Sequence, residues 1–369
     1  MTILEYVDIY GNKTFSEEKF NEVDNIIFSS ISYVNFTNIV KKRKEKITLR
    51  KAANLFFLSN YMDKNNMTSY KSAVTILRKI KDTRRYRGLL LYNYYYLGDE
   101  SQQFSAITIE INKKLVYISY EGTDSLVSGW EEDFKMSYMF PVKAQRNAIN
   151  YINKYIFTNK NIIIGGHSKG GNLALVAGMY ANRFTKKRII AIYSNDGPGL
   201  RNDEFLSDEY KIASLKLISI IPNYSLVSFI LRHSNKYKVV ESSKKGLFAH
   251  DLLTWQVDGT KFREAELSQF SKILNKTMDD WLRKYDYEER KKFTDSLFDV
   301  FRRANVNNLN GLMENKKLIL KLIFETRGIS KTTRVMMREF LSVLYEYVKL
   351  SRKDNKVSQT NWFYLFVMI

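Results

Sequence analysis

One serine in this chain stands between a short apolar run and a helical pattern, in a spacing that can activate a nucleophile. Ser168 is the centre of Gly166-His167-Ser168-Lys169-Gly170, a G-x-S-x-G sequence. Ile162 to Ile164 read as a buried parallel strand before it, and Asn172 to Ala177 read as a helix packed on a sheet after it. Such a strand-to-helix turn strains the serine and exposes its hydroxyl. We therefore predict that Ser168 is a nucleophile at a helix N-terminus; the alternative is a serine that only caps the helix.

Five stretches of the sequence resemble the Mbeg-like family of α/β-hydrolases, bacterial proteins distantly related to the class 3 lipases. They are FSEEKFNEVDNIIFSSISYVNF near the start, SYEGTDSLVSGWEEDF at 119–134, GGHSKGGNLALVAG around the serine, SNDGPGL at 194–200 and FAHDLLTWQVDGTKF at 248–262. The resemblance covers residues 15–300. It implies a serine-hydrolase fold with esterase or lipase chemistry, and it implies no particular substrate.

The chain has three histidines that could serve as the base. His167 lies inside the turn, so its side chain is expected to point away from Ser168 and to be structural. His233 sits in the basic segment LRHSNK, which has no counterpart in the family. His250 comes last in the order Ser, Asp, His that α/β-hydrolases show along the chain, and it matches the histidine segment of the family. We predict that His250 is the base; the alternative is a surface loop histidine.

The acid is where this chain departs from the lipase pattern. Class 3 lipases have an aspartate in a D-x-V context, whereas this chain has Asn223-Tyr224-Ser225-Leu226-Val227 at that place. Ser225 can accept a hydrogen bond from an imidazole but carries no charge to stabilise the imidazolium. Asp196 lies one strand earlier, also at a carboxyl end, where catalytic groups of open α/β sheets gather. We favour Asp196; the alternatives are a dyad oriented by Ser225, or Asp251 beside the base.

The segment Glu121-Gly122-Thr123-Asp124 resembles the family's loop after an earlier strand. In acyl-transfer hydrolases such a loop supplies one donor of the oxyanion hole, and the residue after the nucleophile supplies the other. We assign these two roles to Thr123 and to the backbone N–H of Lys169. A plain turn residue is the alternative for Thr123. A short helix around Asp133 is expected to hold this loop in place.

The whole chain reads as an α/β-hydrolase fold, with a mostly parallel sheet and flanking helices, plus a helical C-terminal region. Three regions are expected: an N-terminal helical cover at 1–85, the α/β-hydrolase core at 86–260 and a C-terminal helical region at 261–369. Helical spacing predicts N-terminal helices that cover one end of the sheet, at 14–35, 49–61 and 69–80. Alternation predicts that the sheet opens with antiparallel strands, at 92–97, 104–111 and 115–120.

Three later segments read as further strands, at 188–193, 215–221 and 237–241. From Lys261 onward the spacing predicts helices only, at 262–274, 278–285, 288–303, 312–323 and 331–350. The last eight residues, Trp362 to Ile369, are nearly all apolar but too few to span a bilayer. They are expected to dock on the helices or to insert shallowly at an interface.

The composition limits the cellular setting and the partners. Cysteine is absent, and no charged start precedes an apolar run, so we expect neither disulfides nor a cleavable signal and a cytoplasmic protein. The net charge of +20 fits an anionic membrane surface or nucleic acid, or simply a genome that favours Lys, Asn, Ile and Tyr. No recognised nucleic-acid motif accompanies the charge, so nucleic acid is the least favoured partner.

These observations predict a serine hydrolase that cleaves a carboxylic ester, with a lipid acyl ester as the favoured substrate and with no metal or cofactor. Ser168 would attack, His250 would take its proton, and Asp196 would orient the imidazole. Two other classes of protein stay open. One is an inactive hydrolase fold that serves as an interaction module, and the other is a basic protein that binds membrane surfaces.

Overall fold

A single mixed sheet forms the centre of the computed structural model, which describes residues 1–41, 45–59, 68–99, 102–123, 127–307, 321–322, 324–325, 329–336 and 338–339. Within these residues eight strands follow one another in chain order: β1 (Ile47–Thr48), β2 (Leu90–Asp99), β3 (Gln102–Asn112), β4 (Leu115–Tyr120), β5 (Asn161–His167), β6 (Ile189–Asn195), β7 (Leu217–Pro222) and β8 (Lys238–Val240). The first three pairs are antiparallel and the last four are parallel. The sequence prediction of a mostly parallel sheet that opens with antiparallel strands is confirmed.

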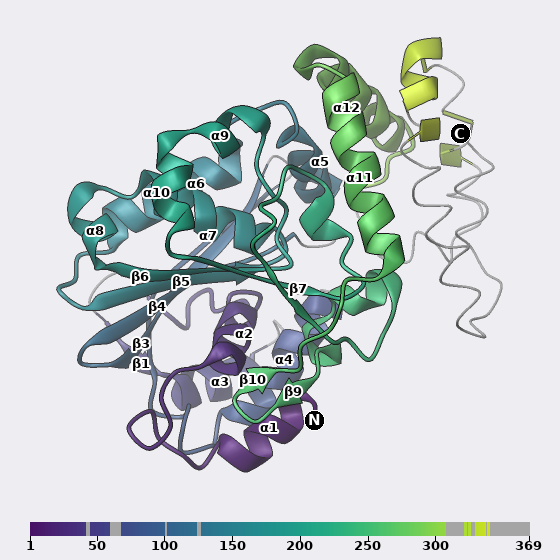
Figure 1. Cartoon of the computed structure of the whole chain (residues 1–369). Helices are drawn as coiled ribbons and strands as arrows, with labels where there is room; N and C mark the ends of the chain where they lie inside the picture. Colours follow the sequence, from purple (N-terminus) through teal and green to yellow (C-terminus); the bar gives the residue numbers. More distant parts are fainter. Residues whose placement is uncertain are drawn as a thin grey trace.

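Helices cover both faces of the sheet (Figure 1). One face is covered by α1 (Ile3–Tyr10), α2 (Glu22–Ile31), α3 (Leu49–Leu58) and α4 (Thr68–Ile80). The other face is covered by α6 (Lys143–Tyr155), α7 (Lys169–Tyr180), α8 (Arg183–Arg188), α9 (Asn202–Leu206) and α10 (Asp208–Ser214). Successive residues of a strand point to opposite faces, so Ile163 belongs to the first core while Ile162 and Ile164 belong to the second. The parallel strands are apolar on both sides for this reason.

The N-terminal helices differ from the prediction in place and in length. They pack over a face of the sheet rather than over one end, because α2 is buried along its whole length against β4 and β5. The predicted helix at 14–35 begins only at Glu22, where the Asn21 side chain accepts hydrogen bonds from the N–H groups of Val23 and Asp24. A helix that the periodicity did not reveal, α1, starts the chain with a capping box of Thr2 and Glu5.

The prediction of helices only from Lys261 was wrong at its start. Lys261–Phe262 form β10, which pairs with β9 (Val257–Asp258), and Glu264 makes an isolated bridge with Val240. Phe262 is 2% exposed, because it packs into the core beneath the sheet instead of starting a helix. The helices begin later, as α11 (Gln269–Lys284) and α12 (Tyr287–Arg303), capped by Ser268 and Asp286.

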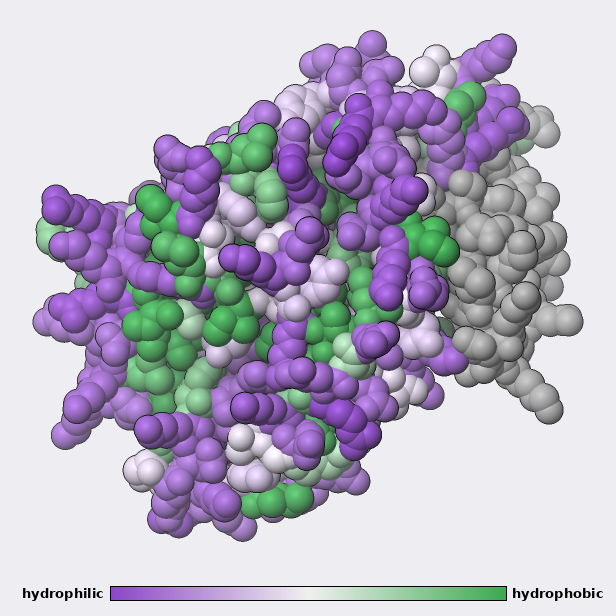
Figure 2. Space-filling model, viewed as in Figure 1, coloured by the Kyte–Doolittle hydropathy of each residue, from purple (hydrophilic) through white to green (hydrophobic). Residues whose placement is uncertain are grey.

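The helix pair α11–α12 packs beside the carboxyl end of the sheet. Its apolar side chains, including Phe270, Trp281 and Phe293, form one core with Phe134 and Leu226. Outward, the pair shows mostly hydrophilic residues on the face drawn in Figure 2. Most of the predicted helices at 312–323 and 331–350, and the whole apolar run at 362–369, lie outside the described residues. Within the described part of the chain, no helix is long and apolar enough to cross a membrane.

A fully buried ion pair joins α2 to the turn that precedes β2. The guanidinium of Arg85 meets both carboxylate oxygens of Asp24, at 2.8 and 2.5 Å, and neither side chain is exposed. Tyr86 donates a further hydrogen bond to Asp24, and Arg85 donates to four backbone carbonyl oxygens of residues 13–19. Every polar atom of the pair has a partner, which is the condition for such a pair to persist in a core.

Replacing Arg85 by Met should strongly destabilise the protein, because it leaves the Asp24 charge buried without its partner. We expect a loss of about 3–5 kcal/mol in the free energy of unfolding, from urea denaturation followed by circular dichroism. Arg84→Met is the matched control. Its guanidinium pairs with Glu17 on the surface, so its loss should cost about 1 kcal/mol or less. Equal losses in the two variants would contradict this account.

Candidate active site

Ser168 occupies the sharp turn between β5 and α7 that the sequence predicts. Its backbone has φ 58° and ψ −134°, a conformation that side chains with a Cβ rarely adopt. A Cβ at Gly166 would lie 2.3 Å from the carbonyl carbon of Gly170, so this crossing of the backbone requires glycine. The Ser168 N–H donates to the Asn195 carbonyl at 2.9 Å, which ties the turn to β6. The predicted elbow geometry is confirmed.

The Ser168 side chain is partly accessible to solvent. The residue is partly exposed, and its hydroxyl makes no hydrogen bond to any other residue that the structure describes. It stands at the N-terminus of α7, where the first N–H groups of the helix have no partner within the helix. The environment of this oxygen therefore favours the build-up of negative charge next to it.

Asp196 and His250 meet at the carboxyl end of the sheet. His250, in the 3₁₀ turn Gly246–His250, has its Nδ1 2.7 Å from Oδ2 of Asp196, which directly follows β6. The Asp196 side chain is buried, and its other oxygen accepts hydrogen bonds from Ser225 at 2.5 Å and Ser228 at 2.7 Å. Burial opposes the carboxylate charge, but the contacts with His250 and the two serines outweigh it and lower the pKa of Asp196.

The other two candidates for the acid lie elsewhere in the hydrogen-bond network. Ser225 donates to Asp196, so it supports the carboxylate instead of replacing it. Asp251 accepts a hydrogen bond from Ser72 at 2.6 Å and caps the short turn Leu252–Thr254. Among the described residues, Asp196 supplies the carboxylate at His250. The structure thus joins Asp196 to His250 at the carboxyl edge of the sheet where the Ser168 turn also lies, and no hydrogen bond links Ser168 to His250.

His167 supports the loop that carries His250. Its imidazole is fully buried and stacks on that of His250, with ring centroids 4.3 Å apart. Nε2 of His167 lies 2.9 Å from the His250 carbonyl oxygen, and Nδ1 lies 3.1 Å from the Tyr33 hydroxyl. Burial, and then the neighbouring His250, lower the pKa of His167 well below its ordinary value, so the ring is neutral. These contacts imply that Nε2 donates to the carbonyl and Nδ1 accepts from Tyr33.

His233 takes no part in this cluster. Its Nε2 lies 3.1 Å from the Ser219 hydroxyl, and its Nδ1 lies 2.8 Å from the Ser234 carbonyl oxygen. Burial lowers its pKa. The structural interpretation of His167 and the exclusion of His233, both made from the sequence, agree with these positions.

The loop assigned to the oxyanion hole runs directly against the serine. A Cβ on Gly122 would lie 2.7 Å from the His167 carbonyl oxygen and 3.0 Å from the Ser168 Cβ. The Thr123 hydroxyl donates a short hydrogen bond to Asp133 in α5 (Val127–Lys135), as the sequence predicted for that helix. The Gly122 carbonyl accepts from Gln103 at 3.0 Å. Asp124 lies outside the described residues.

The side chain of Lys169 supports the loop of Gly122 and Thr123. Its side chain is 1% exposed, and its Nζ donates to Oε1 of Gln103 at 3.0 Å. Glu132 and Asp133 lie 3.6 and 3.8 Å from the ammonium group. The backbone N–H of Lys169 is the group assigned to the oxyanion hole. Its side chain contacts Gln103 and Asp133, which in turn form hydrogen bonds with Gly122 and Thr123.

Sequence reasoning missed several residues that complete the site. The sequence gives no signal for Gln103, because a single glutamine within a strand belongs to no recognisable motif. Ser228 was overlooked in favour of Ser225. Tyr33 lies within the first family-like stretch, which was the only pointer to it. Among the described residues, no group of three or more His, Cys, Asp and Glu side chains could hold a metal ion.

The sheet, the elbow and the residues at its carboxyl edge define an α/β-hydrolase fold. The chain belongs to the Mbeg1-like family, whose model matches residues 80–299. The family expected from the sequence is therefore confirmed. A search among curated proteins found no match.

Solved lipase structures resemble the chain distantly. M37 lipase is 14% identical, with 68% of this chain and 83% of that chain covered and a TM-score of 0.37. The Rhizomucor miehei lipase in its propeptide complex is 12% identical, with coverages of 50% and 71% and a TM-score of 0.34. Lip2 lipase from Yarrowia lipolytica is 13% identical, with coverages of 50% and 73% and a TM-score of 0.32.

The contact between Asp196 and His250 predicts which nitrogen of the neutral imidazole carries the proton. The proton should sit on Nδ1, because the carboxylate can only accept. Asp196→Asn should shift the tautomer toward Nε2–H, as seen in the ¹⁵N chemical shifts of the ring. Asp251→Asn is the matched control and should leave the tautomer unchanged. An unchanged tautomer in Asp196→Asn would argue against the contact.

Proposed function

We propose that this protein is a serine hydrolase that cleaves a carboxylic ester through an acyl-enzyme. The observation that carries the proposal is the hydrogen bond between buried Asp196 and Nδ1 of His250 at the strand edge that also bears Ser168. An imidazole held in this way keeps Nε2 free to accept a proton. A solvated histidine on a surface loop would have no need of a buried carboxylate.

In the proposed reaction His250 takes the Ser168 proton on Nε2 as the hydroxyl oxygen attacks the ester carbonyl. Asp196 stabilises the imidazolium that forms, and its lowered pKa keeps it ionised for that task. The tetrahedral oxyanion receives hydrogen bonds from the backbone N–H of Lys169 and from the loop at Thr123. His250 then gives its proton to the leaving alcohol, and water releases the acid by the reverse sequence.

The preorganisation of the oxyanion loop supports acyl transfer in particular. Gln103 fixes the Gly122 carbonyl and Asp133 fixes the Thr123 hydroxyl, so the loop does not have to order itself during the reaction. Oxyanion donors that are already in place are worth about 3–4 kcal/mol of barrier lowering per donor in enzymes of this kind. A serine that merely caps a helix would need none of these supports.

A lipid acyl ester is the favoured substrate class. Phe248 lies in the same 3₁₀ turn as His250 and is 66% exposed, so it offers an apolar surface on the loop of the proposed base. The likeness of the sequence motifs to class 3 lipases points the same way. A large exposed aromatic side chain next to a catalytic histidine fits an acyl chain better than a polar substrate.

The first test is covalent labelling by a fluorophosphonate probe, which requires an activated serine. The wild type should be labelled, and Ser168→Ala should abolish both labelling and p-nitrophenyl ester hydrolysis. Because the residues act as a unit, His250→Ala should reduce the rate about as far as Ser168→Ala. His233→Ala is the matched control and should keep the wild-type rate. Absence of labelling in the folded wild type would instead favour an inactive interaction module.

The second test ranks the two residues proposed for the acid. Asp196→Asn should lower kcat by roughly 10³- to 10⁴-fold, because the imidazole loses its tautomer and its charge partner. Ser225→Ala should cost less than about tenfold, since the carboxylate retains Ser228 and His250. Circular dichroism establishes that both variants are folded. The opposite ranking of kcat values would make Ser225 the orienting group.

A further inference from the structure

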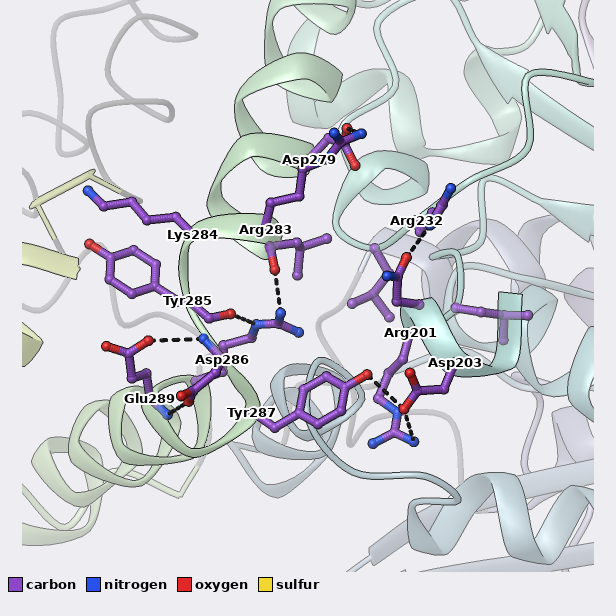
Figure 3. A pocket seen from close by; sticks show the side chains of 15 residues that line it. Arg201, Asp203, Arg232, Asp279, Arg283, Lys284, Tyr285, Asp286, Tyr287 and Glu289 are labelled. Atoms are coloured by element: carbon purple, nitrogen blue, oxygen red, sulfur yellow. Dashed lines mark hydrogen bonds and ion pairs between the residues drawn. The ribbon is translucent and has the colours of Figure 1, made fainter. Parts of the chain in front are cut away.

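A groove separates the hydrolase core from the helix pair α11–α12. Its larger part is a cavity of about 690 Å³ between the segment Leu200 to Asp203 and the α11–α12 connection (Figure 3). A second hollow of about 370 Å³ adjoins it and shares Leu231, Arg232 and Arg283 with it. None of the residues that line either part is Ser168, Asp196 or His250. The groove is therefore distinct from the candidate active site.

A buried arginine without an acidic partner lines the larger cavity. Arg290 is 7% exposed, and its guanidinium donates to the backbone carbonyls of Tyr285 at 2.8 Å, Ser137 at 2.6 Å and Leu282. It forms no ion pair with any carboxylate of the described residues. Three of its five N–H groups are occupied, and the carboxylates of Asp286 and Asp203 act on its charge only from beyond ion-pair distance. Its remaining N–H groups can donate to a ligand, and an anion in the cavity would offset part of the cost of burying this charge.

A second arginine lies close to the first across an aromatic ring. The Arg290 and Arg201 guanidinium carbons lie 5.1 and 4.7 Å from the centroid of the Tyr287 ring. Arg201 is paired with Glu204, at 2.7 and 2.8 Å, so the Glu204 carboxylate is already engaged. The Tyr287 hydroxyl donates to Asp203 at 2.9 Å. These contacts hold the Tyr287 ring in place as a wall of the cavity. They also engage the carboxylates of Asp203 and Glu204.

Three more cations of the groove have no carboxylate partner among the described residues. The Arg232 guanidinium donates to the Asn202 amide oxygen and lies 4.7 Å from the centroid of the Phe205 ring. Lys272 and Lys276 on α11 make no ion pair with a described residue. Arg232 faces the helix pair from the core side of the cavity (Figure 3).

The acidic residues of the groove already have partners. Asp279 pairs with Arg283 at 2.6 Å. Asp286 and Glu289 cap α12 by reciprocal hydrogen bonds to each other's N–H groups, where the helix dipole favours their charge. Asp286 and Glu289 keep their charges at this cap, whereas Arg290 and Arg232 offer further N–H donors from the two sides of a cavity large enough for a small molecule.

We propose that this groove binds a phosphoryl group, held between Arg290 and Arg232 and attracted by Lys272 and Lys276. Guanidinium groups recognise the oxygens of phosphate through paired N–H donors, and a tetrahedral anion can be reached from both walls of the cavity. The phosphoryl group can belong to a soluble phosphate ester or to a phospholipid headgroup. Its binding does not depend on ester hydrolysis at Ser168.

The test uses inorganic phosphate, measured by isothermal titration calorimetry against the same ionic strength of sodium chloride. The wild type should bind phosphate, and Arg232→Gln should weaken the affinity about tenfold. Arg183→Gln is the matched control: Arg183 is exposed on α8, outside the groove, and its loss removes the same charge. Arg290→Gln should abolish binding if it folds. If it does not fold, Arg232→Gln carries the test.

Vesicles distinguish the two sources of the phosphoryl group. Binding to phosphatidylglycerol in phosphatidylcholine vesicles, without binding to pure phosphatidylcholine, and its loss in Arg232→Gln but not in Arg183→Gln, would assign a lipid headgroup. Phosphate binding without vesicle binding would assign a soluble ester. The proposal is overturned if neither ligand binds, or if both variants weaken binding equally, because the charge would then act only through the general surface field.

Discussion

The positive φ of Ser168 is the constraint on which the rest of the site depends. Holding a residue with a Cβ in this conformation costs on the order of 1–3 kcal/mol, so the surroundings must hold it firmly. They do so through β5, which is buried on both faces, and through the hydrogen bond from the Ser168 N–H to Asn195. The Asn195 side chain donates in turn to the Gly166 carbonyl at 3.0 Å and is linked to Asn25 in α2. Contacts with β5, β6 and α2 thus stabilise the strained turn.

The N-terminal helices belong to the site as much as to the cover of the sheet. Tyr33, just beyond α2, bonds His167, and His167 bonds the carbonyl of His250. A neutral imidazole in the core therefore connects the first turn after α2 to the loop of His250, across more than two hundred residues of chain. The orientation of His250 is set from two sides, by Asp196 at its ring and by His167 at its backbone.

The candidate active site and the groove beside α11–α12 offer different groups to a negative charge. Around Ser168 the favourable groups for an anion are backbone N–H groups and a helix terminus, with the Lys169 ammonium turned inward to Gln103 and the acids of α5. In the groove beside α11–α12, the cations Arg232 and Arg290 remain without carboxylates among the described residues. Neutral donors suit a charge that exists only in a transition state, whereas full cations suit a permanent one.

The sequence alone determined the strands around Ser168, the elbow, the family and the residues that meet at the carboxyl edge, because each rests on local spacing or on chain order. It misplaced the start of α2 and the entry to the C-terminal helices. Asn21 caps α2, so this helix begins at Glu22 and not at residue 14. Phe262 fits helical spacing but pairs as part of strand β10. Only the tertiary structure showed that His250 contacts Asp196 and that Ser225 donates to the same carboxylate, and only it revealed Gln103, Ser228 and Arg290. Those contacts join residues distant in the chain, and their energies depend on burial and direction, which no local pattern records.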